Sequence, residues 1–287
     1  MGPFHAGEIE IQRRLDARDD ADRVGRIVAS EIPDRVVRVL AAQRLAVAAS
    51  LDVQRRPWAS LLTGGPGFIT AVDAQLLSLA VPPRTDDTLA TDLSAHPDLG
   101  LLVIDPRTRL RLRVNGRGLL GPEGLFLLVR QVYGNCQKYI QKRRIVAESS
   151  GEPGAVRRSE SLDPRQRALV AHADTFFIAT WHPEGGADAS HRGGRPGFVR
   201  VLDERTLEFP DYPGNNMFNT LGNILGHPSA GLLFADFDTG NVVQVAGSAR
   251  ILGETDLAVR IEIDEVRETP GGLPLRLELV EPSPANP

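Results

Sequence analysis

The sequence repeats itself, and this repeat constrains the fold more than any other feature. Residues 33–118 align with residues 164–249 at an offset of about 130 positions, with one single-residue slip near the middle. Pro66-Gly67-Phe68, for example, falls on Pro196-Gly197-Phe198. Other matched pairs are Ala59-Ser60 with Ala189-Ser190, Asp73 with Asp203, His96-Pro97 with His227-Pro228, and Gly116 with Gly247. A collinear series of this kind indicates a tandem duplication, so both halves should share one fold.

Each half predicts the same order of short elements. Helix-like stretches open the halves at 34–43 and 164–173, and another precedes each His-Pro pair, at 85–95 and 216–226. The intervening runs are rich in Val, Ile, Phe and Thr, which favour strands. The expected strands are 45–51, 58–62, 67–72, 76–81, 100–104 and 109–114, with counterparts at 175–181, 187–192, 197–202, 206–209, 231–235 and 241–245. This spacing predicts an α+β chain, mostly antiparallel β, with a small barrel in each half.

The segments outside the repeat should connect or cover the two barrels. Gly124–Val146 is apolar and then basic, and we expect it to be helical, whereas 147–161 has the Gly, Ser and Pro content of a flexible linker. The last seven residues include three prolines and should fray. The expected organisation is an N-terminal arm (1–32), a first barrel (33–122), a helix and linker (123–162), a second barrel (163–280) and a tail (281–287).

Composition excludes several classes of protein. The 33 Lys and Arg against 37 Asp and Glu leave a net charge of -4, so no basic excess favours nucleic acid or an anionic membrane. A single cysteine, Cys136, excludes an intramolecular disulfide and a cysteine-type zinc site. His5, Glu8 and Gln12 are too dispersed to be metal ligands, so we expect no metal and assign them to an arm that packs on a barrel. Neither a membrane-spanning run nor a signal peptide is recognisable, and we expect a cytoplasmic protein.

The two halves differ most where an anion could bind. A phosphate group requires positive charge and several donors, which an arginine on a strand and polar residues at a helix start can supply. Leu62 and Asp86 stand in the first half where the second half has Arg192 and Asn216. The second half is therefore predicted to hold the anion, and the first half to have lost its site. The proposed set in the second half is Ser190, His191, Arg192, Asn215, Asn216, Asn219 and Thr220.

Structural roles remain open for these residues. Asn215 and Asn216 also suit turns and helix caps. Arg192 could pair with a surface carboxylate instead of a ligand. His191 alternates with Arg192 along the strand, so only one of the two should face a given groove.

Several motifs carry a resemblance to a known family. The strand order, the inserted helix that ends in His-Pro and the following GLLxxD strand resemble the flavin-binding split β-barrel of the pyridoxamine 5'-phosphate oxidase-like superfamily. This resemblance covers about 33–118 and 164–265. A tandem subfamily, described as pyridoxamine 5'-phosphate oxidase-related FMN-binding proteins, is similar in more specific pieces. These are FHAGEIEIQ (4–12), VYGNCQKYIQKR (132–143), ASHRGGRPGFV (189–199) and PDYPGNNMFNTLGNI (210–224).

In that superfamily two barrels pair, and FMN lies in the groove between them. The resemblance implies that the duplication fuses such a pair into one chain, a pseudo-dimer that is either a monomer or a homodimer. It places the phosphate and ribityl contacts of the flavin at Ser190, Arg192, Asn216, Asn219 and Thr220.

Contacts to the flavin ring would come partly from the first half. Trp58 and Ser60 lie on the strand equivalent to that of Arg192, and either could face the ring, although Trp58 could equally fill the core. Asn135, Lys138 and Tyr139 offer two donors and a stacking face. The same segment could instead be a helix break with a solvated basic face.

The resemblance implies a flavin-dependent oxidoreductase that transfers electrons or hydride to a small molecule, with NAD(P)H or a separate electron-donor protein as reductant. Because the flavin carries the chemistry, no catalytic residue is assigned. Pyridoxamine phosphate oxidase activity itself is not expected, since RLELVEPSPANP replaces the Arg- and Trp-rich C-terminal signature. The alternatives are a flavin carrier without turnover, a haem-binding relative served by His182, His191 or His227, and a deazaflavin-dependent protein.

Overall fold

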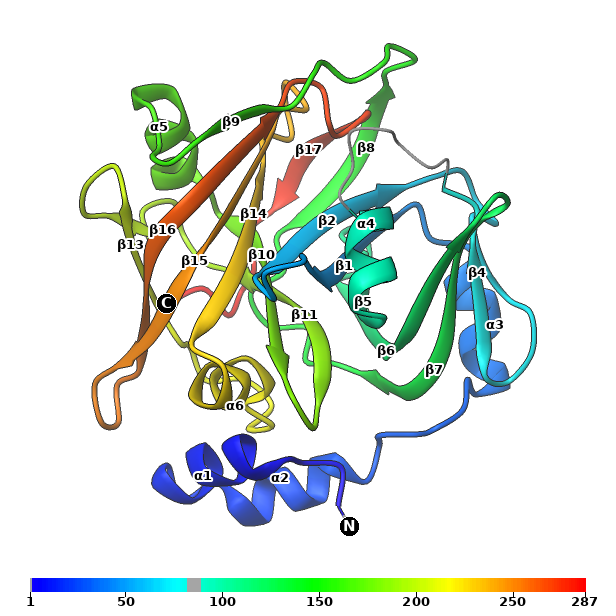
Figure 1. Cartoon of the computed structure of the whole chain (residues 1–287), viewed down its shortest axis with the longest axis vertical. Helices are drawn as coiled ribbons and strands as arrows, with labels where there is room; N and C mark the ends of the chain where they lie inside the picture. Colours follow the sequence, from blue (N-terminus) through cyan, green and yellow to red (C-terminus); the bar gives the residue numbers. More distant parts are fainter. Residues whose placement is uncertain (1, 82–88) are drawn as a thin grey trace.

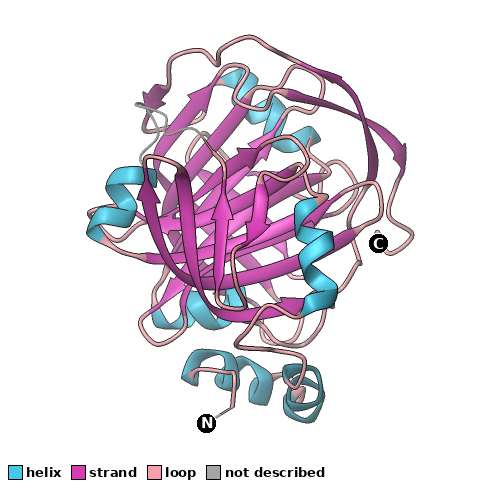
Figure 2. Ribbon diagram, turned by 90° about the vertical axis from the view of Figure 1, so that its right-hand side faces the viewer, coloured by secondary structure: helices cyan, strands magenta, loops and turns pink. Residues whose placement is uncertain are grey.

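The computed structural model describes residues 2–81 and 89–287 of the chain. Its strands form two large antiparallel sheets and one small two-stranded sheet, with the helices arranged around them (Figure 2). The expected architecture, mostly antiparallel sheet with few helices, is confirmed. Within the described residues, no helix combines the length and the apolar character needed to cross a membrane.

The two large sheets repeat one strand order. The first runs β2-β1-β5-β6-β7-β4-β3, and the second runs β11-β10-β14-β15-β16-β13-β12, which is the same path strand for strand (Figure 1). The first sheet consists of β1 Leu45–Leu51, β2 Pro57–Thr63, β3 Ile69–Ala71, β4 Leu76–Leu79, β5 Asp98–Asp105, β6 Leu110–Gly121 and β7 Gly124–Gly134. The second consists of β10 Thr175–His182, β11 Gly186–Gly193, β12 Arg200–Val201, β13 Thr206–Pro210, β14 Ser229–Ala235, β15 Val242–Leu252 and β16 Ala258–Thr269. The repeat in the sequence is therefore also a repeat in space.

The register and the helices follow the same repeat. Ser60 pairs with Ala48 in the first sheet, as Ser190 pairs with Ile178 in the second. The helices α3 (Asp34–Ala41) and α5 (Pro164–His172) open the two halves, and α4 (Leu89–Ala95) and α6 (Asn219–Gly226) precede the His-Pro pairs. Asp163 caps α5 through hydrogen bonds from the amides of Arg165 and Gln166, and Pro164 occupies its first turn.

The expectation of a helix over Gly124–Val146 is wrong. Gly124–Gly134 forms β7, which pairs with β6 along its length, and Lys142–Glu148 forms β8. The run LFLLVRQVY contains bulky and β-branched residues, and from Leu125 to Arg130 the side chains alternate between buried and more exposed positions, as a strand requires. The first sheet thus extends to residue 134 and gains the counterpart of β16.

The linker and the tail are also more ordered than expected. β8 pairs with β17 (Leu275–Glu281) in the small sheet, and β9 (Arg157–Ser159) pairs with β16. Beyond β17, the amide of Ser283 donates to Gln141 Oε1 at 2.7 Å, and Arg195 Nε donates to the carbonyl of Pro287 at 2.8 Å. These bonds hold the C-terminal residues against the body, so the expectation of a frayed tail is wrong.

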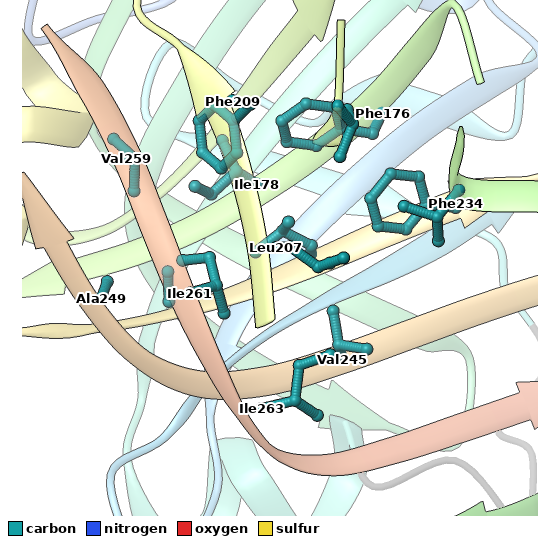
Figure 3. Close-up of a cluster of buried hydrophobic side chains, with 14 of the residues drawn as sticks. Phe176, Ile178, Leu207, Phe209, Phe234, Val245, Ala249, Val259, Ile261 and Ile263 are labelled. Atoms are coloured by element: carbon teal, nitrogen blue, oxygen red, sulfur yellow. The ribbon is translucent and has the colours of Figure 1, made fainter. Parts of the chain in front are cut away.

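Buried apolar side chains form a cluster within each sheet and another between the sheets. In the second sheet the ring of Phe176 lies 4.9 Å from that of Phe209 and 5.3 Å from that of Phe234 (Figure 3). The cluster between the sheets joins Val47 and Leu102 of the first half to Phe177 and Leu233 of the second. The two halves are therefore packed through a continuous apolar interface.

Two glycines let the halves approach each other at equivalent points. A Cβ on Gly100 would lie 2.6 Å from the carbonyl oxygen of Ala187, and one on Gly231 would lie 2.2 Å from that of Pro57. Both obstacles are backbone atoms of the other half, which cannot turn aside as a side chain could. The two contacts are related by the repeat, so the halves meet with approximate twofold symmetry.

The substitution Gly231→Ala should destabilise the protein by about 1–3 kcal/mol, because its methyl group overpacks the interface. Thermal unfolding of the variant checks this. Gly151→Ala is the matched control, since its Cβ would meet nothing closer than Ser149 Oγ at 3.5 Å. Equal melting temperatures for the two variants would show that the interface can widen without cost.

Candidate anion-binding site between the two sheets

A cleft lies where β11 and the start of α6 face β6 and the turn after β7. The volume of the cleft is about 70 Å³, which is room for a phosphate group. We call it the arginine cleft, because Arg111, Arg113 and Arg192 all line it. Most of the residues predicted from the sequence come together here: Asn135, Tyr139, Ser190, His191, Arg192, Asn215, Asn216, Asn219 and Thr220.

Three predicted residues lie elsewhere. Trp58 is fully buried in β2, where its indole donates to Asp52 at 3.1 Å, and the guanidinium of Arg267 lies 3.6 Å from its ring centroid. Ser60 is buried on the same strand, and Lys138 is exposed. None of the three lines the arginine cleft. The repeat places Trp58 and Ser60 at the positions of Asp188 and Ser190, so these two belong to the equivalent region of the other half.

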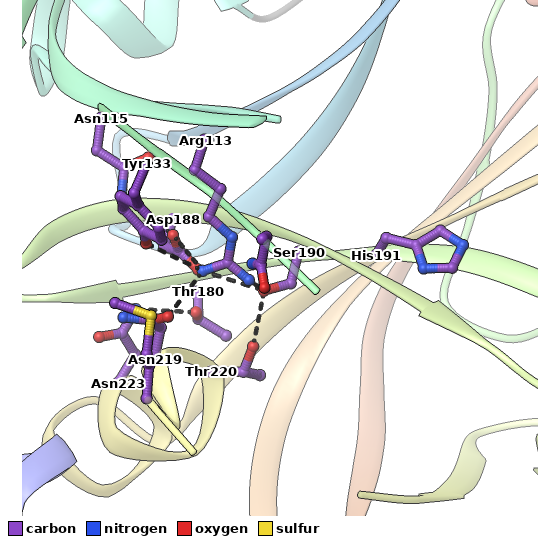
Figure 4. Close-up of polar contacts among 12 residues, drawn as sticks. Arg113, Asn115, Tyr133, Thr180, Asp188, Ser190, His191, Asn219, Thr220 and Asn223 are labelled. Carbon is purple, nitrogen blue, oxygen red and sulfur yellow. Dashed lines mark hydrogen bonds and ion pairs between the residues drawn. The ribbon is translucent and has the colours of Figure 1, made fainter. Parts of the chain in front are cut away.

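The residue that organises the arginine cleft was not predicted. Arg113, on β6, donates from Nη1 to both carboxylate oxygens of Asp188, at 2.8 and 2.7 Å (Figure 4). It also donates to Asn219 Oδ1 at 3.0 Å and to the hydroxyl of Ser190. Ser190 in turn lies 3.0 Å from the hydroxyl of Thr220. One guanidinium from the first half therefore orders three polar residues of the second.

Burial and the charge of Asp188 have opposite effects on the pKa of Arg113. Only 6% of Arg113 and 4% of Asp188 is exposed. Burial is the largest single effect and lowers the pKa of Arg113, but Asp188 and Tyr133 together outweigh it and raise that pKa. Arg113 is therefore a fixed cation whose charge Asp188 balances locally.

Arg111 is the cation without a counter-charge. Burial, and then the positive charge of Arg113, lower its pKa to about 9. Its guanidinium lies 3.4 Å from the ring nitrogen Nδ1 and from the carbonyl of His191. No carboxylate in the described part of the chain forms an ion pair with it. Burying an unpaired cation is unfavourable, so this position favours an anion.

Arg192 and His191 are the two titratable residues that β11 contributes to the arginine cleft. Arg192 lies 3.0 Å from Asp211 Oδ1, so the carboxylate pairing that the sequence left open is present. Burial raises the pKa of Asp211, although Arg192 opposes this. Burial, and then Arg111, lower the pKa of His191 well below its usual value, so its imidazole is neutral. Figure 4 shows its ring pointing away from the Arg113 network, as alternation along the strand requires.

Four buried nitrogen atoms in the arginine cleft lack a hydrogen-bond partner among the described residues. They are Arg111 Nε, Arg113 Nε, Arg192 Nε and His191 Nε2. Buried polar groups in folded proteins are nearly always satisfied, so unpaired groups gathered in one cleft point to a ligand. Because three of the four are guanidinium donors, that ligand is an acceptor with negative charge.

The start of α6 supplies further polar groups. Asn216 and Phe218 have φ values of 61° and 59°, a left-handed conformation that asparagine tolerates and phenylalanine rarely adopts. The chain turns at these two residues, and as a result Asn219 and Thr220, in the first turn of α6, line the arginine cleft. The amide groups at a helix start add partial positive charge there.

The equivalent region of the other half has lost every one of these cations. The repeat places Leu62 at the position of Arg192, Val242 at that of Arg111 and Gln244 at that of Arg113. Gln244 donates to the carbonyl of Ala59 at 2.7 Å, and Trp58 fills the position of Asp188. Asp86, the other first-half residue compared above, lies outside the described residues. The predicted asymmetry between the halves therefore extends to β6 and β15.

The histidines considered as haem ligands have other surroundings. The His182 ring stacks on that of His5 at 3.7 Å, and His227 Nε2 lies 3.0 Å from the carbonyl of Arg55. Within residues 2–81 and 89–287, no group of three or more His, Cys, Asp or Glu side chains is arranged to hold a metal ion.

Comparison with known proteins finds a family match in the second half of the chain. Residues 162–273 match the family model of pyridoxamine 5'-phosphate oxidase. Similar solved structures include a pyridoxamine 5'-phosphate oxidase candidate from Lactobacillus delbrueckii, with 19% identity over 38% of this chain and 94% of that one and a TM-score of 0.32. A FAD-binding protein from Mesorhizobium loti has 15% identity over 40% of this chain and 96% of that one, with a TM-score of 0.29.

A third similar structure is related to a general stress protein of the pyridoxinephosphate oxidase family, from Clostridium acetobutylicum. It has 10% identity over 39% of this chain and 89% of that one, with a TM-score of 0.30. No curated protein sequence matches the chain. The similarity of this chain to a known family therefore lies in the region 162–273, which matches the model of pyridoxamine 5'-phosphate oxidase.

Proposed function

We propose that this protein binds FMN noncovalently, with the phosphate end in the arginine cleft, and that it is a flavin-dependent oxidoreductase acting on a small molecule. The two sheets with equal strand order are, in this proposal, the paired split barrels of a tandem pseudo-dimer. The observation that carries the proposal is the set of buried, unpartnered donors beside the uncompensated Arg111 cation.

The residues of the arginine cleft fit a phosphate monoester. Arg111 and Arg192 would provide charge-assisted hydrogen bonds through their free Nε donors, and the hydroxyls of Ser190 and Thr220 would add neutral ones. Arg113 would position Ser190 and Asn219 rather than bind the anion, because its charge is already matched by Asp188. Tyr139 and Tyr212, with rings 5.3 Å apart, give the cleft an aromatic wall.

FMN, when bound, would supply electron or hydride transfer through its ring. The chain would then contribute binding, orientation and control of access, which is the usual role of the protein in a flavoenzyme. The reductant would be NAD(P)H or a separate electron-donor protein.

Titration of the purified protein with FMN and with riboflavin tests the phosphate assignment. Quenching of flavin fluorescence should give at least tenfold tighter binding for FMN, because riboflavin lacks the anion that the cleft recognises. Equal affinities would reject the phosphate site. The absorption spectrum of the protein as isolated separates the cofactors, since a Soret band would indicate haem and a deazaflavin spectrum would indicate the third alternative.

The substitution Arg111→Val, which copies Val242 of the other half, should weaken FMN binding about 10- to 100-fold and leave riboflavin binding nearly unchanged. The physical reason is the loss of a charge-assisted hydrogen bond and of the uncompensated cation. Arg144→Val is the matched control, because Arg144 is an exposed strand arginine paired with Glu278. A parallel loss of FMN and riboflavin affinity would instead indicate that Arg111 only supports the fold.

Enzyme and carrier differ in turnover. Anaerobic addition of NAD(P)H should bleach the bound flavin, and quinones, nitro compounds or oxygen should restore its colour. A flavin that none of these reductants bleaches would favour the carrier.

A further inference from the structure

A second cavity lies beneath the N-terminal arm. The helices α1 (Ala6–Arg14) and α2 (Arg18–Gly25) lie side by side, below α6 and the tip of β11 in Figure 1. Between the arm, β11 and β6 is a space of about 590 Å³, within the usual range for small-molecule sites. We call it the acid-lined cavity.

The arm is fixed in place, so the cavity has defined walls. His5 Nε2 lies 2.9 Å from Asn223 Oδ1, and Asn219 Nδ2 donates to Glu8 Oε1 at 2.5 Å. Gln12 Nε2 donates to the carbonyl of Met217 at 3.1 Å. These three side chains are buried, and each ties α1 to α6 or to the loop before it.

The charge of the lining is opposite to that of the arginine cleft. The carboxyl groups of Glu8, Asp98, Glu184 and Asp188 line the cavity, against the single guanidinium of Arg130 among the described residues. Asp188 is neutralised by Arg113, whereas Asp98 accepts a hydrogen bond from the indole N–H of Trp181, at 2.9 Å, and forms no ion pair with any described residue. Burial raises the pKa of Glu8 to about 7, so the negative charge of the lining comes mainly from Asp98 and Glu184, and with these two the cavity favours a cation.

An unsatisfied acceptor points the same way. Asn115 lines the cavity and is 6% exposed. Its amide nitrogen donates to Asp188 Oδ1 at 3.1 Å, which fixes the orientation of the amide and leaves Oδ1 without a partner among the described residues (Figure 4). A buried carbonyl oxygen left in this way requires a donor from a ligand or from solvent. Together with the carboxyl groups, it selects a molecule that donates hydrogen bonds and carries positive charge.

The arm provides the apolar part of the lining. Pro3, Phe4 and Ile9 face the cavity from the N-terminal side, opposite Asn115 and Asp188 on the strands. A ligand that satisfies both sides has a cationic head and an apolar body. We propose that the acid-lined cavity binds a small organic primary ammonium ion of this kind, an arylalkylamine in its protonated form, with Asn115 Oδ1 and Asp98 receiving the ammonium group.

This site is distinct from the proposed flavin phosphate site, and the amine needs no flavin to bind. The two sites share Asn219 alone among their lining residues, and the Arg113–Asp188 ion pair lies at their boundary. An anion in the arginine cleft and a cation in the acid-lined cavity could therefore be bound at the same time, each next to side chains of opposite charge.

Isothermal titration calorimetry of the flavin-free protein with benzylamine at neutral pH tests the proposal. Benzyl alcohol is the matched neutral probe and benzoate the anionic one. Benzylamine should bind saturably and at least tenfold more tightly than benzyl alcohol, because only the ammonium form satisfies the acceptors. Any affinity tag is placed at the C-terminal end, since Gly2 lines the cavity.

Two variants locate the binding. Asn115→Ala and Asp98→Asn should each weaken benzylamine binding about tenfold, and the second keeps the size of the side chain and an oxygen for Trp181. Glu123→Gln, an exposed carboxylate outside the cavity, is the control and should bind as tightly as the unaltered protein. Urea unfolding verifies that each variant is folded before it is titrated.

The outcomes separate this proposal from the flavin proposal. Benzylamine binding that survives saturation with FMN and falls in both cavity variants supports the amine site, whether or not FMN binds as proposed. Equal binding of benzylamine and benzyl alcohol, or unchanged benzylamine affinity in both cavity variants, would overturn it. Loss of benzylamine binding when FMN is added would also overturn it, because the cavity would then belong to the flavin.

Discussion

Replacing Arg113 with methionine should destabilise the protein by about 3–5 kcal/mol, the cost of leaving a buried carboxylate without its cation. Asp188 would keep only the amide of Asn115, at 3.1 Å, and the hydroxyl of Ser190, at 3.3 Å. Urea unfolding followed by tryptophan fluorescence measures the loss. Trp58 and Trp181 report on the first and second halves respectively.

The matched control is Arg144→Met, which breaks the exposed ion pair with Glu278 and should cost less than 1 kcal/mol. The double variant Arg113→Met/Asp188→Asn should be more stable than Arg113→Met, because no buried charge is left unpaired. A single variant no less stable than the Arg144→Met protein would mean that water reaches Asp188 freely, and the Arg113 network would then have no structural role.

The repeat explains why so much of the fold could be predicted. β1 occupies the residues expected for it, and α3 and α5 begin where the sequence indicates. Each aligned position has a counterpart in the other half, so a secondary-structure prediction that is ambiguous in one half can be settled by the sequence of the other. The prediction of a helix at 124–146 had no such support, because β16, the counterpart of β7, lies beyond the aligned range.

The candidate site was predicted on one of its two sides. Comparison along β11 and the start of α6 found Arg192 and Thr220, because the other half has Leu62 and Ala90 at those positions, whereas Ser190 has a counterpart in Ser60. Arg111 and Arg113 were missed, although Val242 and Gln244 replace them in the same way. Both arginines lie on β6, which faces β11 across the interface between the two halves. Tertiary packing brings these two strands together, so a comparison of the two halves along the sequence does not show that they share a site.

The same reasoning explains the error at Trp58. A site between two related halves takes a strand from one half and the facing strand from the other. Trp58 is the counterpart of Asp188, so it lies in the equivalent region of the other half, where the guanidinium of Arg267 covers its ring and Gln244 donates to the carbonyl of the neighbouring Ala59. In the other half, β15 has Val242 and Gln244 in place of the two arginines, and the buried indole of Trp58 occupies the position of Asp188. This region is therefore packed core and not an anion site.

The substitution Glu8→Gln should make the protein progressively more stable than the unaltered one as the pH rises from 4.5 to 7. Burial raises the pKa of Glu8 from 4.5 to about 7, the hydrogen bonds from His5 and Asn219 offsetting only part of the effect. Between these pH values the unfolded chain has lost the proton that the folded chain still binds, so Glu8 reduces stability as the pH rises. The accumulated cost is about 3 kcal/mol and should be constant above pH 7.

Urea unfolding of the two proteins at pH 4.5, 5.5, 6.5 and 7.5 measures this difference. Subtracting one profile from the other is necessary because burial lowers the pKa of His5 to about 4, which stabilises the fold in the opposite direction as the pH rises from about 4 to 6.5. Glu10→Gln, an exposed change on the same helix, is the control and should give a difference that does not vary with pH. A flat difference for Glu8→Gln as well would place water at that carboxylate, and the contact of α1 with Asn219 would then be looser than the 2.5 Å hydrogen bond indicates.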